Sequence, residues 1–322
     1  MKAAVVSGAG QVPAYLDFPE PVAGEDEDLV TVTAAAINPV TRSRASGTHY
    51  SSTGVFPMIP GVEGVGRRAD GQRIFFFMPR PPYGALSERT VVGKGAGIAL
   101  PDDLDDVTAA AIGNPGASSW AALTERAHFR PGQTVLVNGA TGTAGRLAVQ
   151  IARHLGAGRV IGAGRNPDVL ERLKALGADA VIALNAGEDA LEESFRAEFS
   201  RGVDVVLDYL WGNPARVALT AAAKAGRDDR PMRFVSIGSV AGAEIALPSA
   251  VLRSSSIELV GSGLGSIPRE RLVPTLSALL SAAGSGRLTV DAMAVPLVDI
   301  AKVWTTASEG RRIVVTPGGA GA

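Results

Sequence analysis

A glycine-rich turn near the middle of the chain contains the residues with the clearest chemical use. Residues 135–138 have the composition of a buried strand, and residues 147–155 have apolar side chains at helical spacing. Between them, Gly142 lets the backbone approach a pyrophosphate and Gly145 lets the helix pack closely on the strand, whereas Ala140 replaces the first glycine of the dinucleotide fingerprint. Free amides at the helix start add partial positive charge. The residues expected to hold a dinucleotide here are Ala140, Gly142, Thr143, Ala144 and Gly145.

The end of the next predicted strand indicates which dinucleotide would bind. An NAD site places an acidic residue there, but residues 162–166 contain none and include Arg165. The guanidinium of Arg165 can bind a 2′-phosphate through charge-assisted hydrogen bonds, which favours NADPH. The alternative is that Arg165 is a surface charge and Asp168 is the missing acid. However, residues 166–168, Asn-Pro-Asp, are more typical of a helix N-cap, first helical residue and dipole-complementing acid.

Composition excludes several classes of function. The chain has 322 residues, a net charge of -1 and 46% hydrophobic residues, which argues against a nucleic-acid or anionic-membrane partner. Cysteine is absent, so disulfides, thiolate catalysis and cysteine-bound metal sites are excluded. No signal peptide or membrane-spanning run is apparent, and a cytoplasmic location is therefore expected.

The order of predicted elements divides the chain in two. Short β-branched runs separated by turns dominate the first 115 residues, and the acidic residues 25–28 are interpreted as a solvated turn. Strands and helices then alternate, which predicts a doubly wound parallel sheet over residues 116–285. Residues 286–322 return to β character and are expected to complete the first domain, of residues 1–115.

Several segments together resemble the medium-chain dehydrogenase/reductase superfamily, and most of all its zinc-free quinone oxidoreductase branch. The resemblance covers nearly the whole chain. The segments that match, in the order of the family, are residues 36–50, 60–64, 83–88, 203–208 and 234–239. The resemblance implies an α/β fold, with a Rossmann doubly wound parallel sheet and a mostly-β GroES-like catalytic domain. It also implies hydride transfer from NADPH to a quinone or an α,β-unsaturated carbonyl.

The same resemblance suggests catalytic residues. Asn38 and Tyr50 are candidates to donate hydrogen bonds to the acceptor oxygen, on which charge develops. Two other interpretations stay open, because Asn38 before Pro39 can form a turn and Tyr50 can lie on a mobile loop. The further positions that resemble the family's cofactor contacts are Asn38, Ser118, Gly238 and Ser239. Ser118 could equally cap the helix that follows it.

A catalytic zinc is not expected. Zinc-dependent members of the superfamily have cysteine where this chain has Asn38 and histidine where it has Val62, and Glu63 alone cannot supply three or four ligands. Apolar residues near residues 56–58, 75–78 and Tyr83 could line a substrate pocket, although Phe75 and Phe77 are predicted to be core residues.

Two other functions remain open: an enoyl-thioester reductase of the same fold, and an NADPH-binding sensor without turnover. A short-chain reductase is disfavoured because Tyr209 has no lysine four residues later. The strand predicted over residues 257–260 resembles the superfamily's pairing edge, which indicates a homodimer.

Overall fold

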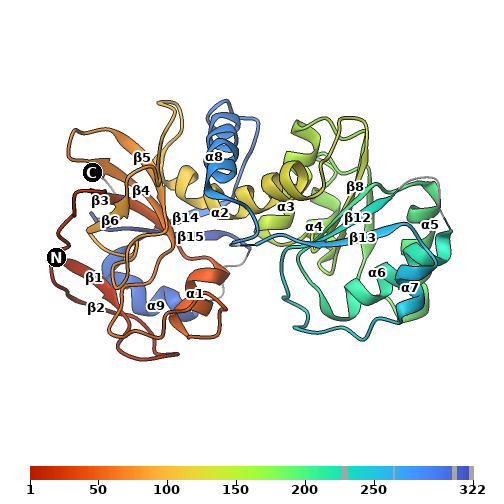
Figure 1. Ribbon diagram of the computed structural model, residues 1–322, viewed down its shortest axis with the longest axis horizontal. Coiled ribbons are helices and arrows are strands. Elements are labelled where there is room, and N and C mark those ends of the chain that lie inside the picture. Colours follow the sequence, from red (N-terminus) through yellow and green to blue (C-terminus); the bar gives the residue numbers. More distant parts are fainter. Residues whose placement is uncertain (227–230, 264, 307–309, 319–322) are drawn as a thin grey trace. The chain divides into compact units, whose positions relative to one another are not determined.

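The computed structural model of the chain describes residues 1–226, 231–263, 265–306 and 310–318 (Figure 1). It divides into two compact units. Unit 1 consists of Met1–Asn114 and Val273–Ala322, and unit 2 consists of Pro115–Leu272. The domain boundary predicted at 285 differs from this division, which assigns residues 273–285 to unit 1. Residues 307–309 and 319–322 of the predicted return segment lie outside the described residues.

Unit 2 contains a six-stranded parallel sheet with the strand order β10-β9-β8-β11-β12-β13. The chain therefore winds one way from β8 to β10 and the other way from β11 to β13. The predicted doubly wound sheet is confirmed. Its switch point lies between β8 and β11, where ligands of such sheets bind beyond the carboxyl ends of the strands. The strand bounds are β8 Thr134–Asn138, β9 Arg159–Gly164, β10 Ala180–Ala183, β11 Val205–Asp208, β12 Met232–Ser236 and β13 Ile257–Gly261.

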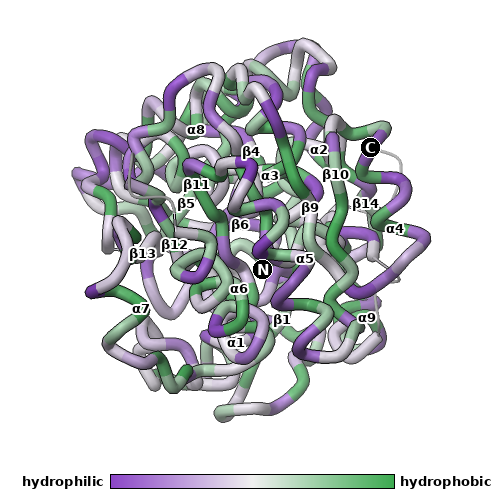
Figure 2. The backbone as a smooth tube through the Cα atoms, turned by 90° about the vertical axis from the view of Figure 1, so that its right-hand side faces the viewer, coloured by the Kyte–Doolittle hydropathy of each residue, from purple (hydrophilic) through white to green (hydrophobic). Residues whose placement is uncertain are grey.

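Helices cover this sheet and bury its apolar residues. Phe195 and Phe199 of α5 pack with Val217 of α6 and with strand residues such as Leu136 and Phe234 in one cluster. Apolar colour runs along β10 (Figure 2), an edge strand whose Ile182 is buried in this cluster. The helices of the unit are α3 Thr143–His154, α4 Pro167–Arg172, α5 Glu188–Arg201, α6 Gly212–Ala225 and α7 Ser249–Arg253.

Unit 1 is mostly β. Its larger sheet has the order β14-β15-β3-β4-β5-β7, with β6 also paired to β3, and β1 and β2 form a separate hairpin-like pair. The last strand, β15, pairs antiparallel with β3 through Val314 and Ala36, although the two residues lie far apart in the sequence. The strand bounds are β1 Lys2–Val5, β2 Ala14–Asp17, β3 Glu27–Ala36, β4 Glu63–Arg68, β5 Arg73–Phe77, β6 Arg89–Gly93, β7 Gly97–Ala99, β14 Ala292–Pro296 and β15 Arg312–Thr316.

Short helices complete unit 1, and two longer helices contain the boundaries between the units. The short ones are α1 Pro39–Ala45, the 3₁₀ turn Leu297–Asp299 and α9 Ile300–Thr305. The longer ones are α2 Asp106–Ala121, which continues as the π-helix Ala122–Arg126, and α8 Arg269–Gly284. Within the part of the chain that the structure describes, no helix has the length and apolar character needed to cross a membrane.

The interpretation of residues 25–28 as a solvated turn was wrong for its second half. Strand β3 already begins at Glu27. Two arginines on neighbouring segments explain the difference, since Arg68 Nε lies 3.0 Å from Asp28 Oδ2 and Arg80 Nε lies 3.3 Å from Glu27 Oε1. Because of these ion pairs, Glu27 and Asp28 belong to the sheet, although their negative charge is more typical of a turn.

Candidate functional site

The predicted glycine turn follows β8 and has the required geometry. Gly139 has a φ of +97°, in the region that favours glycine. A Cβ atom at Gly145 would lie 2.2 Å from the carbonyl oxygen of Gly139, so only glycine permits this approach of helix to turn. At Gly142, by contrast, the nearest such atom is 3.7 Å away. The loop is therefore tightly packed beneath Gly145 and open at Gly142.

Helix α3 begins at this turn without a capping side chain. Gly142 is its N-cap residue and cannot supply one, and no acidic residue lies in the first turn. The first intrahelical bond runs from the Arg146 amide to the Gly142 carbonyl at 2.9 Å, so the amides of Thr143 and Ala144 precede the hydrogen-bonded helix. Such a helix start fits an anionic ligand, because the amides and the helix dipole both favour negative charge.

The end of β9 lies at the same edge of the sheet as the glycine turn. Arg165 is exposed there, and in the described ranges its guanidinium has no ion pair. Asn166 is the N-cap of α4 and accepts a hydrogen bond from the Val169 amide at 3.1 Å, with Pro167 and Asp168 in the first turn. The prediction for residues 166–168 is confirmed. Asp168 therefore has a local role at the helix start, and Arg165 stands without an acid beside it.

An asparagine and an aspartate meet at the switch point of the sheet. Asn138 ends β8 and Asp208 ends β11, and Asn138 Nδ2 donates to Asp208 Oδ1 at 2.8 Å. The backbone amides of Leu210 and Trp211 donate to the same carboxyl group at 3.2 and 3.0 Å. Burial raises the pKa of Asp208 to about 6, against these hydrogen bonds, which lower it. This pair was not predicted from the sequence, where its signal is a polar residue at the end of each of two parallel strands.

The hydroxyl groups near the end of α2 bond within unit 2. Ser118 and Ser119 lie inside the helix, and both donate to the Pro115 carbonyl, at 2.9 and 3.1 Å. The alternative that Ser118 caps a following helix is wrong, because α2 runs on through it to Ala121. The Ser119 hydroxyl also lies 2.7 Å from the Tyr209 hydroxyl, and burial raises the pKa of Tyr209 to about 12.

The segment after β12 reaches the same carboxyl edge. The amides of Ile237 and Gly238 donate to the Asp208 carbonyl at 2.7 and 3.2 Å. A Cβ at Gly238 would lie 2.7 Å from the Tyr209 carbonyl oxygen, so glycine is needed for this close approach. Ser239 follows and is exposed. The structure thus brings the candidates Gly238 and Ser239 to the edge that also holds the glycine turn.

In unit 1, the candidate Asn38 is buried, and both the oxygen and the nitrogen of its amide have hydrogen-bond partners. Its Oδ1 accepts from the amide and the hydroxyl of Thr41, both at 2.8 Å, which makes Asn38 the N-cap of α1. Its Nδ2 donates to Glu63 Oε1 at 3.1 Å, and the same oxygen accepts from the Asn114 amide at 3.1 Å. Burial raises the pKa of Glu63 to about 7, while these hydrogen bonds and the charge of Arg312 lower it.

The other catalytic candidate, Tyr50, has the opposite environment. Its side chain is 72% exposed, whereas that of Asn38 is 1% exposed. The ring of Tyr50 packs on the ring of His49, with a centroid distance of 4.1 Å. The two candidates therefore differ in accessibility, because Tyr50 is exposed and Asn38 is buried.

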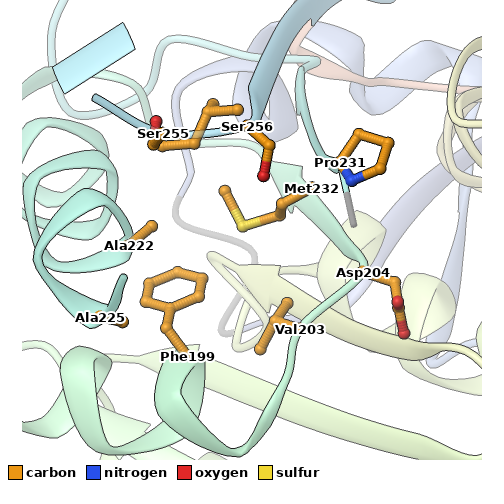
Figure 3. Close-up of a pocket in the computed structure, with 10 residues that line it drawn as sticks. Phe199, Val203, Asp204, Ala222, Ala225, Pro231, Met232, Ser255 and Ser256 are labelled. Carbon is orange, nitrogen blue, oxygen red and sulfur yellow. The ribbon is translucent and has the colours of Figure 1, made fainter. Parts of the chain in front are cut away.

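Each unit contains a small cavity. The cavity in unit 2 lies away from the candidate site residues, whereas the cavity in unit 1 lies beside two of them. The cavity in unit 2 has a volume of about 30 Å³ and lies at the amino ends of β11, β12 and β13, opposite to the glycine turn (Figure 3). The cavity in unit 1 has a volume of about 20 Å³ and adjoins Asn38 and Glu63 through Thr41 and Val62, respectively. Met58 and Tyr83 line this second cavity, whereas Phe75 and Phe77 are buried core residues, as predicted.

Among the residues that the structure describes, no cluster of three or more histidine, aspartate or glutamate side chains could hold a metal ion. Glu63 bonds to Asn38 and Asn114, and the neighbouring Val62 offers no ligand atom.

Comparisons with known proteins agree with this fold. A family model described as zinc-binding dehydrogenase matches residues 144–282, which begin in the first turn of α3. A probable NADPH-dependent quinone reductase of Emericella nidulans is 29% identical, over 98% of this chain and 100% of the relative. A solved quinone oxidoreductase of Thermus thermophilus, also determined in complex with NADPH, is 29% identical with a TM-score of 0.82, over 98% of this chain and 100% of its own.

A third relative belongs to a much larger enzyme. One polypeptide of the phenolphthiocerol/phthiocerol polyketide synthase of Mycobacterium tuberculosis is 29% identical over 82% of this chain but only 12% of the relative. The fold, the glycine turn and these matches agree on one class of protein, the nucleotide-binding oxidoreductases. These matches support a quinone oxidoreductase-like protein that is similar to members of the medium-chain dehydrogenase/reductase superfamily.

Proposed function

We propose that the protein is an oxidoreductase that transfers hydride from NADPH to a quinone or an α,β-unsaturated carbonyl. The observation that carries this function is the arrangement at the carboxyl edge of the parallel sheet. There the open glycine turn and the start of α3, which has no capping side chain, lie at the same edge as Arg165, which has no ion pair among the described residues. The quinone reductases similar to this chain over their whole length support the same activity.

The residues at this edge fit the phosphorylated parts of NADPH. The amides at the start of α3 and the bare backbone at Gly142 suit a pyrophosphate, and Arg165 suits the 2′-phosphate that distinguishes NADPH from NADH. When bound, NADPH supplies the hydride. The residues proposed to hold it are Asn38, Ser118, Ala140, Gly142, Thr143, Ala144, Gly145, Arg165, Gly238 and Ser239.

Hydrogen-bond donors of the chain would stabilise negative charge on the acceptor oxygen. Tyr50, an exposed residue with a phenolic hydroxyl, is one candidate donor. Asn38 Nδ2 carries two hydrogens, and Glu63 takes one of them, which leaves the other for an acceptor oxygen. Because the chain has no cysteine and has Val62 where a zinc ligand would lie, these donors replace a metal ion in the proposed zinc-independent mechanism.

Enoyl-thioester reduction is the second candidate function, and the similarity to part of a polyketide synthase favours it. It uses the same fold and the same reductant, so only the acceptor differs. Turnover of a crotonyl thioester above that of free quinones and enones would support it.

An NADPH-binding sensor is the third alternative, for which the expectation is tight binding of NADPH without turnover of any acceptor.

A homodimer and a cytoplasmic location complete the proposal. Strand β13 lies at the edge of the unit 2 sheet, and an edge strand offers unpaired backbone groups to a second copy. Light scattering after size-exclusion chromatography tests this, with a dimeric mass expected for the wild type and a monomeric mass for Leu259→Pro.

The experiment that tests the function measures oxidation of NADPH and NADH with quinones, enals and enones. We expect turnover with NADPH, and a rise in KM for NADPH of about tenfold or more in Arg165→Ala, since hydrogen bonds to charged groups contribute about 1.5–3 kcal/mol. Arg172→Ala, an exposed arginine of the same segment, is the matched control. Equal effects of Arg165→Ala on NADPH and NADH would contradict the assigned role, and a lack of turnover with every acceptor would contradict the enzyme.

A further inference from the structure

Helix α1 carries two half-buried arginines with different partners. The guanidinium of Arg42 lies over the ring of Trp304, 5.7 Å from its centroid. Arg44 has no hydrogen bond, ion pair or aromatic partner for its guanidinium in the described part of the chain, and burial lowers its pKa. Since an arginine stays charged in proteins, Arg44 is a partly desolvated cation without compensation.

Arg44 lines the small cavity of unit 1. None of the lining residues is acidic, so nothing in the cavity wall neutralises the guanidinium. Thr41, Thr53 and Tyr83 add hydroxyl groups, and the rest of the wall consists of apolar side chains, prolines and a glycine.

His49, a titratable residue on which the charge of Arg44 acts, does not balance that charge either. His49 Nδ1 accepts a hydrogen bond from the Ser51 amide at 3.1 Å, so this nitrogen carries no proton. Burial and the charge of Arg44 both lower the pKa of His49, which keeps the ring neutral near pH 7. The cavity therefore presents one cationic group on a wall that is otherwise apolar or neutral.

We propose that this cavity binds a carboxylate group carried by the electron acceptor, with Arg44 as the residue that selects it. The volume of about 20 Å³ suits a group the size of a carboxylate rather than a ring. Thr41 lines the cavity and also donates its hydroxyl hydrogen to Asn38. Thr53 and Val55, which line the cavity too, follow Tyr50 closely in the sequence. The inference rests on the proposed function, and it narrows the substrate class to quinones or enones with an acidic side group.

Matched pairs of acceptors test this selectivity. The probes are 4-oxopent-2-enoate and 3-(1,4-benzoquinon-2-yl)propanoate, each beside its methyl ester, with NADPH as reductant. We expect kcat/KM for the acid to exceed that for the ester at least tenfold in the wild type, and the ratio to fall close to one in Arg44→Met. Arg44→Lys should restore part of the preference, while Arg42→Met, the matched control on the same helix, should keep the wild-type ratio.

A binding measurement separates this inference from the proposed function. Calorimetry with 3-phenylpropanoate and its methyl ester, in the presence and absence of NADPH, should show tighter binding of the acid in the wild type and no preference in Arg44→Met. If no acceptor is turned over, the proposed function fails and this binding difference still decides the role of Arg44. Equal binding and equal turnover of acid and ester in the wild type, or a preference that persists in Arg44→Met, would overturn the inference.

Discussion

Both units bury a carboxyl group against an asparagine, but the two pairs have different tasks. In unit 1, Glu63 accepts from Asn38 and from the Asn114 amide, so it joins segments that are distant in the sequence. In unit 2, Asp208 accepts from Asn138 and from the nearby amides of Leu210 and Trp211. Glu63 thus ties separate segments together, whereas Asp208 shapes the turn that follows its own strand.

The two asparagines differ in the same way. Both ends of the Asn38 amide have partners, because Oδ1 caps α1 and Nδ2 reaches Glu63. Asn138 Oδ1 is buried and has no partner in the described part of the chain. The chain after Asp208 is also strained, since Trp211 has a φ of +51°. The pair in unit 1 therefore has partners at both ends of the Asn38 amide, while the pair at the switch point keeps one buried oxygen without a described partner next to a strained residue.

Removal of Asp208 should have the largest effect on stability. Asp208→Ala leaves three donors without an acceptor in a buried place, and we expect a loss of about 3–5 kcal/mol in the free energy of unfolding. Asp208→Asn keeps an oxygen that can accept from Asn138 and should cost less. Urea unfolding followed by tryptophan fluorescence measures both. A loss below about 1 kcal/mol in Asp208→Ala would show that the turn does not depend on this carboxyl group.

The pH dependence of stability separates the two acids. Each has a folded pKa above its ordinary value, about 7 against 4.5 for Glu63 and about 6 against 3.8 for Asp208. The folded state therefore binds more protons than the unfolded state between these values, and each contribution is fully present below the ordinary pKa and is lost as pH rises through the folded one. The free energy of unfolding should therefore fall as pH rises towards these folded pKa values. Glu63→Gln should remove the part of this fall that Glu63 causes, which extends to about pH 7 and amounts to about 3 kcal/mol at most. The part that Asp208 causes, which extends to about pH 6, should remain.

Unfolding of the wild type and Glu63→Gln at a series of pH values checks this prediction. The glutamine oxygen can still accept from Asn38 and Asn114, so the variant tests the charge and not the hydrogen bonds. A variant that keeps the full pH dependence of the wild type would show that Glu63 is not the group that titrates.

Loss of the Asn38 amide should have a moderate effect. Asn38→Ala removes the N-cap of α1 and the donor to Glu63, and we expect a loss of about 1–2 kcal/mol. Asn38→Ser keeps a capping oxygen and should recover the larger part of this loss. Chemical unfolding of the two variants beside the wild type measures the difference. If the alanine and serine variants unfold alike, the contribution of Asn38 lies in its bond to Glu63 and not in the cap.

Tyr50→Phe should have the smallest effect on stability and a clear effect on activity. The exposed hydroxyl contributes within about 0.5 kcal/mol to folding, as is usual for surface substitutions. If the hydroxyl donates to the acceptor oxygen, kcat should fall about 100-fold with KM for NADPH unchanged. Steady-state kinetics check this prediction. Tyr15→Phe, which removes the hydroxyl group of another tyrosine, is the control. Unchanged kcat in Tyr50→Phe would remove Tyr50 from the proposed mechanism.

Features that depend on neighbours in the chain could be predicted from the residue types and their spacing. The glycine turn between a strand and a helix, the N-cap at Asn166 and the alternating strands follow from local rules of backbone freedom, capping and apolar spacing. The doubly wound parallel sheet also followed, because alternating strands and helices with right-handed connections admit few arrangements. The lack of an acidic residue at the end of β9, beside Arg165, is likewise a property of residue type and spacing alone.

Contacts between residues that are distant in the sequence could not be predicted, because they depend on how the strands and helices pack. The bond of Asn38 to Glu63 and the position of Arg44 in a cavity without acids involve segments brought together by the sheet of unit 1. The acidic stretch that became the start of β3 depended in the same way on Arg68 and Arg80. Burial and pairing set the charge state and the accessibility of a polar side chain, and both are properties of the packed fold. A sequence shows the type of each residue, but the folded chain decides what surrounds it.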